Sequence, residues 1–107
     1  MRIELNQVVW MDEHAVSRAE LVELSGLTPE LLDQLIDAGG IEPLPAAAPE
    51  PRFGARALSA ARQARRLQQD FELDVSALLL VLGLHERIEE LESQLRALRA
   101  KLPPRLR

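Results

Sequence analysis

The sequence predicts a mainly helical, all-α protein with three parts: a winged helix-turn-helix over residues 1–74, a coiled-coil helix over residues 75–102 and a disordered tail over residues 103–107. Three observations predict this class. Two short segments with helix-capping residues flank a glycine, a proline-rich stretch follows them, and apolar residues recur in heptads near the carboxyl end. Leu and Ala carry most of the apolar content and only 3% of the residues are aromatic, which favours helix over sheet.

The first predicted helix follows residues 3–10, whose loose alternation of apolar residues indicates a short strand. Ser17 suits the N-cap of this helix, and Glu20 three residues later completes a capping box. Gly26 suits the left-handed position that follows a helix end. We therefore expect a helix between Ser17 and Gly26.

A second helix is predicted directly after the first. Thr28 suits its N-cap and Pro29 its first position, where the missing N–H costs nothing, and Gly39 and Gly40 mark its end. Two short capped helices joined by a glycine-containing turn form a helix-turn-helix. The second helix of such a pair is the one that enters the DNA major groove.

Residues 41–54 occupy the place of a wing. Four prolines within nine residues leave few backbone donors for a hairpin, so we expect an irregular wing with short extended pieces at residues 41–42 and 52–53. A third helix is expected over residues 56–70. Its apolar face is formed by Ala57, Ala60, Ala61, Ala64, Leu67 and Phe71.

The last predicted helix begins at an Asp74 N-cap and carries a seam of heptad-spaced apolar residues along its length. The pattern persists for more than three heptads, which is typical of a coiled coil and predicts a homodimer. The alternative is a helix that packs only within its own chain. The seam residues expected to form the dimer are Val81, Leu84, Ile88, Leu91, Leu95, Leu98 and Leu102.

The charge of the second helix is the feature most informative about function, because it contains no Lys and no Arg. Residues 1–50 hold 2 Arg against 10 Asp and Glu, a net charge of −8, whereas residues 51–107 hold 11 Lys and Arg against 7 Asp and Glu, a net charge of +4. Proteins that bind DNA neutralise phosphates with Lys and Arg, so an acidic helix in the reader position argues against tight binding of duplex DNA. We call acidic face the predicted partner-binding residues Glu20, Glu23, Glu30, Asp33, Gln34 and Asp37.

Two interpretations of the acidic face remain open. It binds a basic protein, or its carboxylates are only a solvated helix surface. Glu30 in particular lies in the first turn, where the helix dipole favours a carboxylate whatever the function.

The order of helix-turn-helix, wing, third helix and long coiled-coil helix resembles the MerR superfamily. A closer resemblance is to the chaperone modulatory proteins of the CbpM family, and it covers about residues 16–102. It is carried by Leu-Thr-Pro-Glu-Leu-Leu at residues 27–32, Gly-Ile-Glu-Pro at residues 40–43, Arg-Phe at residues 52–53, Arg-Leu-Gln-Gln-Asp-Phe-Glu-Leu-Asp at residues 66–74 and Ala-Leu-Leu-Leu-Val-Leu at residues 77–82.

This resemblance implies a dimer that binds the J-domain of a CbpA-type co-chaperone and blocks its engagement with the chaperone DnaK. It also implies a basic helix on that J-domain as the surface that the acidic face contacts. One alternative is a MerR-like DNA-binding transcription regulator that uses the patch Arg62, Arg65 and Arg66, helped by Arg52 and Arg56. A second alternative is a structural coiled-coil adaptor that keeps the helix-turn-helix only as a fold.

Other functions receive no support from the sequence. There is no cysteine, which excludes disulfide and thiol chemistry. His14 and His85 are far apart and neither has a second ligand at metal-binding spacing. No nucleophile–base set or glycine-rich phosphate loop occurs, so we expect no enzyme, no cofactor and no metal. No apolar run is long enough to cross a membrane, and a cytoplasmic location is expected.

Overall fold

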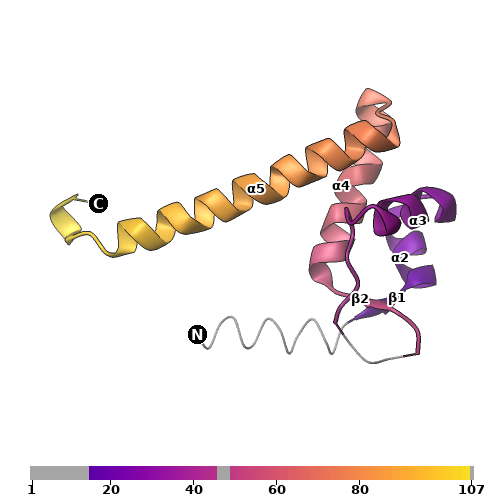
Figure 1. Cartoon of the computed structure of the whole chain (residues 1–107), viewed down its shortest axis with the longest axis horizontal. Helices are drawn as coiled ribbons and strands as arrows, with labels where there is room; N and C mark the ends of the chain where they lie inside the picture. The colour runs from indigo at the N-terminus through magenta and orange to yellow at the C-terminus, as the bar shows by residue number, and fades with distance from the viewer. Residues whose placement is uncertain (1–14, 46–48, 107) are drawn as a thin grey trace.

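The computed structural model describes residues 15–45 and 49–106. It confirms the predicted fold class, a small helical domain from which one long helix projects (Figure 1). The strand predicted at residues 3–10 lies outside the described residues. In chain order the elements are β1 (Val16–Ser17), α2 (Arg18–Ser25), α3 (Pro29–Asp37), β2 (Arg52–Phe53), α4 (Ala55–Phe71), α5 (Val75–Ala100) and a 3-10 turn, η1 (Pro104–Leu106).

The start of α2 confirms the predicted capping box. The Ser17 hydroxyl accepts a hydrogen bond from the Glu20 N–H at 3.2 Å, and Glu20 Oε1 accepts one from the Ser17 N–H at 3.1 Å. Two backbone donors that have no partner inside the helix are thereby satisfied. Helix α2 ends at Gly26, whose φ of 80° is easily adopted only by glycine.

The local signals of α3 and α5 are confirmed in the same way. Thr28 Oγ1 accepts from the Leu31 N–H at 3.2 Å, with Pro29 in the first turn. Asp74 Oδ1 accepts from the Ala77 N–H at 2.9 Å. Helices α2 and α3, joined through Gly26, form the predicted helix-turn-helix.

The core lies between the helix-turn-helix, α4 and the beginning of α5. Helix α4 contributes mainly alanines, and their short side chains let α2 and α5 approach it closely. Full burial of a Leu or Phe side chain stabilises a fold by about 1.5–3 kcal/mol. The largest fully buried side chains are Leu21, Leu32, Leu35, Ile41, Phe53 and Leu78.

Of the two extended pieces predicted to flank the wing, only one forms a strand. Arg52 and Phe53 do form a short strand, but residues 41–42 do not. Instead β2 pairs antiparallel with β1, so that Val16 lies opposite Phe53. The reason is that Ile41 is buried in the core with its N–H bonded to Leu35 O at 3.3 Å, which holds it at the end of α3.

One further expectation is wrong. Phe71, predicted on the apolar face of the third helix, has 66% of its surface exposed, because it lies in the last turn of α4 at the corner leading to α5. The tail predicted to be disordered contains the turn η1, in which the Leu106 N–H donates to Pro103 O at 2.9 Å. Consecutive prolines restrict the backbone there and favour such a compact turn.

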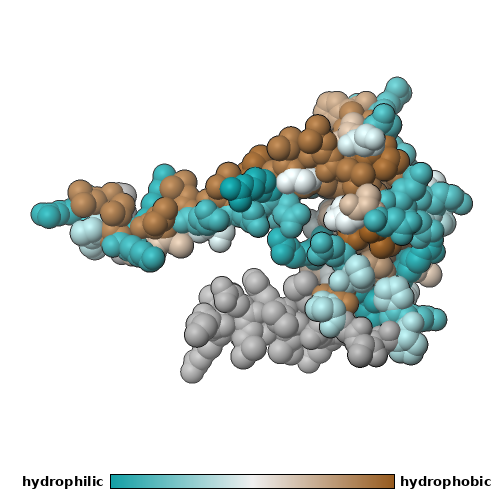
Figure 2. Space-filling model, in the orientation of Figure 1, coloured by the Kyte–Doolittle hydropathy of each residue, from teal (hydrophilic) through white to brown (hydrophobic). Residues whose placement is uncertain are grey.

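Helix α5 has two environments along its 26 residues. Its first turns bury Leu78 and Leu82 in the core, whereas the rest extends about 25 Å beyond the domain at 1.5 Å per residue. Apolar residues recur along the projecting part, among hydrophilic ones (Figure 2). Val81 of the seam is half-buried, and the other six seam residues are 40–61% exposed.

Candidate functional site

The acidic face is built on α3, which is anchored from its other side. Leu31, Leu32 and Leu35 are buried in the core. This burial fixes the rotation of α3 about its axis and turns the opposite side outward. Glu30, Asp33, Gln34 and Asp37 are all exposed there, as are Glu20 and Glu23 on α2.

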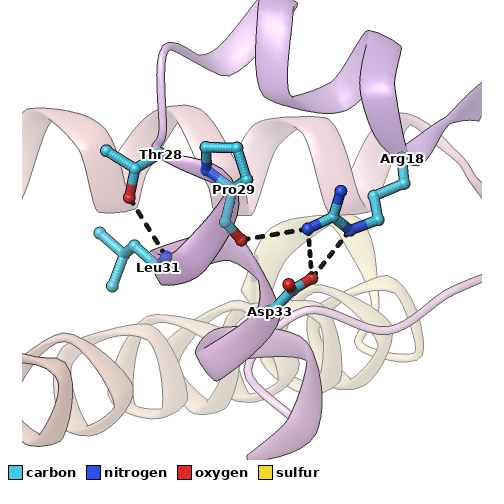
Figure 3. Close-up of polar contacts among 5 residues, drawn as sticks. All are labelled: Arg18, Thr28, Pro29, Leu31 and Asp33. Carbon is cyan, nitrogen blue, oxygen red and sulfur yellow. Dashed lines mark hydrogen bonds and ion pairs between the residues drawn. The ribbon is translucent and has the colours of Figure 1, made fainter.

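An arginine outside the predicted acidic face joins the two helices (Figure 3). Arg18, the first residue of α2, donates from Nε to Asp33 Oδ1 at 2.8 Å, and its Nη2 lies 2.7 Å from the same oxygen. Nη2 also donates to Pro29 O at 3.3 Å. The acidic face is therefore not an unbroken row of carboxylates, because the charge of Asp33 is matched from within the chain.

No pattern in the sequence reveals the ion pair between Arg18 and Asp33. The two residues are 15 positions apart, so neither helical spacing nor strand pairing relates them. Only composition singles out Arg18, because it is one of only 2 basic residues among the first 50. Both side chains are about half exposed, 41% and 51%, which is typical of pairs worth about 0–1 kcal/mol.

Glu20 contributes to the start of α2 more than to a binding surface. The hydrogen bond that it accepts from the Ser17 backbone N–H lowers its pKa, and the Ser17 hydroxyl and the nearby charge of Arg52 lower it further. Its carboxylate is thus held ionised in the capping box. On α2, Glu23 remains as the exposed carboxylate that has no role in helix capping.

A groove of about 450 Å³ lies between the loop after α3, the start of α4 and the middle of α5. Its lining includes the apolar side chains of Leu44 and Leu82, the carboxylates of Glu42, Glu86 and Glu89, and the guanidinium of Arg56. His85 also lines the groove, and its Nε2 lies 3.0 Å from Glu89 Oε1. No sequence pattern reveals this groove, because its carboxylates come from segments more than 40 positions apart.

The three arginines of the predicted patch on α4 do not share one environment. Arg65 is half-buried and packs along Gly26, where a Cβ atom would lie 3.4 Å from its Nε. Arg62 and Arg66 are exposed and line a second depression of about 380 Å³ beside Phe53. Arg52 donates to the backbone oxygen of Ala15, which holds it against the start of β1.

Two other kinds of site are absent from residues 15–45 and 49–106. No group of three or more His, Cys, Asp or Glu side chains is arranged there to hold a metal ion. No helix in this part of the chain is both long enough and apolar enough to span a membrane.

Comparison with known proteins identifies the family. No curated protein matches the chain. The family model described as MerR HTH family regulatory protein matches residues 16–100, which extend from β1 to the last residue of α5. The match therefore includes the helix-turn-helix, the wing, α4 and the seam helix, and the chain belongs to the MerR HTH family.

Proposed function

We propose that this MerR-family protein is a chaperone modulator that binds the J-domain of a CbpA-type co-chaperone and blocks its engagement with DnaK. The observation that carries the proposal is the composition of α3. In a helix-turn-helix this helix reads DNA, yet here its exposed residues include Glu30, Asp33 and Asp37 and no Lys or Arg. Such a surface repels phosphate and complements a basic protein helix.

Because Arg18 pairs with one carboxylate of the acidic face, fewer carboxylates there carry unmatched negative charge for a partner. Asp33 is already matched, so the negative charge available to a partner comes mainly from Glu30 and Asp37, with Gln34 between them as a neutral hydrogen-bonding group. Both contacts that Arg18 makes with Asp33 use Oδ1, which leaves the other carboxylate oxygen to accept from a partner. We assign Arg18 the role of holding α2 and α3 together at the edge of this surface.

The proposal includes a homodimer formed through the seam, in a cytoplasmic protein. Six seam residues expose 40–61% of their surface on a helix that extends beyond its own domain. Soluble monomers rarely expose contiguous apolar patches larger than a few hundred Å². A second α5 supplies the complementary surface that heptad spacing demands.

The test is calorimetric titration of the protein with the isolated J-domain, comparing Asp37→Lys with a matched control, Glu50→Lys. Both residues are exposed, and both substitutions change the net charge by the same amount. We expect Asp37→Lys to weaken binding about tenfold or more, corresponding to about 1.4 kcal/mol, and Glu50→Lys to have little effect. Circular dichroism checks that both variants are folded. If the two variants bound the J-domain with equal affinity, the acidic face would not be the binding surface.

A second candidate function, a DNA-binding transcription regulator, is favoured by the family description and by the exposed side chains of Arg62 and Arg66 on α4. Gel-shift titration of short duplex DNA at two salt concentrations tests it. The discriminating variant is Arg62→Ala with Arg66→Ala, which leaves Arg65 in its packing position against Gly26. Tight, salt-sensitive binding that this variant abolishes would support the regulator function instead.

A further inference from the structure

The groove of about 450 Å³ beside α5, which we call the α5 groove, lies outside the acidic face. It is formed by the loop after α3, the start of α4 and the middle of α5, at the point where α5 leaves the domain (Figure 1). Its volume falls within the range of about 300–1,000 Å³ that is typical of ligand sites in proteins. The groove is thus large enough to hold a short peptide segment.

Contacts within the chain hold the walls of the α5 groove in place. The Gly40 N–H donates to Leu35 O at 2.8 Å, and a Cβ atom on Gly40 would lie only 2.7 Å from Leu79 Cδ2, so the loop after α3 packs directly on α5. Further along this loop, the Leu44 N–H donates to Arg52 O at 2.8 Å. Because the walls are already fixed, little ordering is required when a partner binds.

The lining of the α5 groove combines apolar surface with unpaired carboxylates. Leu44 and Leu82 supply apolar side chains, together with prolines of the loop and alanines of α4. Glu42 and Glu86 are exposed, and neither forms an ion pair with another residue in the ranges 15–45 and 49–106. Long basic side chains match such a surface, because their aliphatic stems pack on apolar groups while their charged ends reach a carboxylate.

The net charge of the lining is negative. Its three carboxylates stand against one guanidinium, that of Arg56, so the charge is −2 when His85 is neutral. Gly39, which also lines the groove, lies two residues beyond the end of α3, where the helix dipole adds partial negative charge. The α5 groove therefore begins just beyond Asp37 of the acidic face and carries charge of the same sign.

A dimer formed through the seam uses a different side of α5. The groove is lined from α5 by Leu82, His85, Glu86 and Glu89. The seam residues of the same stretch are Val81, Leu84, Ile88 and Leu91. At about 100° per residue, the centres of these two sets are roughly 130° apart around the helix. A second α5 packed on the seam would therefore lie away from the groove, which stays accessible to another protein.

We propose that the α5 groove binds a second basic segment of the same protein that binds the acidic face, so that a Lys or Arg side chain of this segment pairs with Glu42 or Glu86 and its aliphatic stem packs on Leu82. This inference rests on the proposed function, because it concerns the same J-domain partner, but it assigns a contact outside the helix-turn-helix. Two separate contacts of complementary charge fix the orientation in which the partner lies along α3.

Charge reversal in the groove tests this contact by calorimetric titration with the isolated J-domain at low salt, where screening is weakest. The test variant is Glu42→Lys with Glu86→Lys, and the matched control is Glu50→Lys with Glu90→Lys. In each pair one residue lies between α3 and β2 and the other on α5, and all four are exposed, but only the first pair lines the groove. We expect the test variant to bind about tenfold more weakly than the control, with α3 unchanged in both.

A neutral substitution separates entry into the groove from long-range attraction. Gln63 lines the groove from α4, so Gln63→Trp should fill part of it. The matched control is Gln69→Trp, which adds the same ring at an exposed position of α4 outside the groove. We expect Gln63→Trp to weaken binding about fivefold or more and Gln69→Trp to have little effect. Circular dichroism checks that all the variants are folded.

The outcomes distinguish a failure of this inference from a failure of the proposed function. If the parent binds the J-domain and both groove variants bind as tightly as their controls, the groove is not a contact, and only this inference is wrong. If the parent does not bind the J-domain, the proposed function and this inference are both wrong. If the groove variants alone change the oligomeric state in sedimentation without the J-domain, the groove binds a second copy of the chain, which also overturns this inference.

Discussion

Arg18 and Asp33 join the two helices of the helix-turn-helix through a contact of 2.7 Å between Nη2 and Oδ1. Arg18 also donates to Pro29 O, so that one side chain holds both the first and the second turn of α3. The pair places a positive charge at the edge of the acidic face. It therefore affects both the orientation of α3 and the charge that the proposed partner would meet.

Breaking this pair should have a small effect on stability. Because both side chains are about half exposed, a double-mutant cycle with Arg18→Ala and Asp33→Asn should give a coupling free energy of about 0.2–1 kcal/mol, smaller at high salt. The measurement is urea unfolding of the four proteins of the cycle. A coupling near zero at low salt would mean that the ion pair does not hold α2 to α3 in solution.

Two glycines should respond to alanine in opposite ways. Gly83 lies within α5 and a Cβ atom there would meet nothing within 4 Å, so Gly83→Ala should stabilise the protein by about 0.5–1 kcal/mol. Gly26 has a φ of 80°, so Gly26→Ala should destabilise it by about 1–2 kcal/mol. Thermal unfolding at fixed protein concentration measures both. Effects of the same sign would contradict the conformations of these two positions.

Glu20 should contribute to stability in a way that depends on pH. Its pKa in the folded protein is lowered from the ordinary value of 4.5 by the hydrogen bond from the Ser17 N–H, so its stabilising effect is complete above 4.5 and is lost as the pH falls through the lowered value. Gln in its place does not titrate but still accepts a hydrogen bond. Between neutral pH and the acidic range, the free energy of unfolding of the Glu20→Gln variant should therefore fall less than that of the parent protein. Parallel curves for the two proteins would show that the capping box is not formed in solution.

Replacing Ile88 and Leu95 with Asp should abolish the proposed homodimer. Both side chains are about half exposed in the single chain, at 52% and 48%, so their substitution removes little from the core of the domain. It would place carboxylates in the apolar layers between two helices, which is costly without partners. Light scattering should give a monomer while circular dichroism still detects the helices of the domain. A folded dimer with both substitutions would exclude the seam as the dimer interface.

The sequence predicted the features that short-range chemistry determines. Ser17, Thr28 and Asp74 each cap a helix through a hydrogen bond to a residue three positions away, so residue types in order were sufficient. The heptad spacing likewise predicted the long helix, and the family match agrees with the whole arrangement.

Features that depend on distant parts of the chain could not be predicted. The partner of β2 is β1 rather than the nearby residues 41–42, because core burial of Ile41 decides the pairing. Phe71 fits the apolar face of α4 by periodicity, but nothing in its own segment shows that the fold leaves the end of α4 uncovered. The ion pair of Arg18 with Asp33 and the groove beside α5 arise only when the elements come together.

The most direct test of the central claim is titration calorimetry of the parent protein with an isolated J-domain of a CbpA-type co-chaperone, at low and at physiological salt. The account predicts a saturable complex whose affinity falls as salt is added, because the acidic face attracts a basic helix. The J-domain bound in this way should no longer stimulate DnaK. An absence of binding heat and of any complex in sedimentation at either salt concentration would contradict the proposed function.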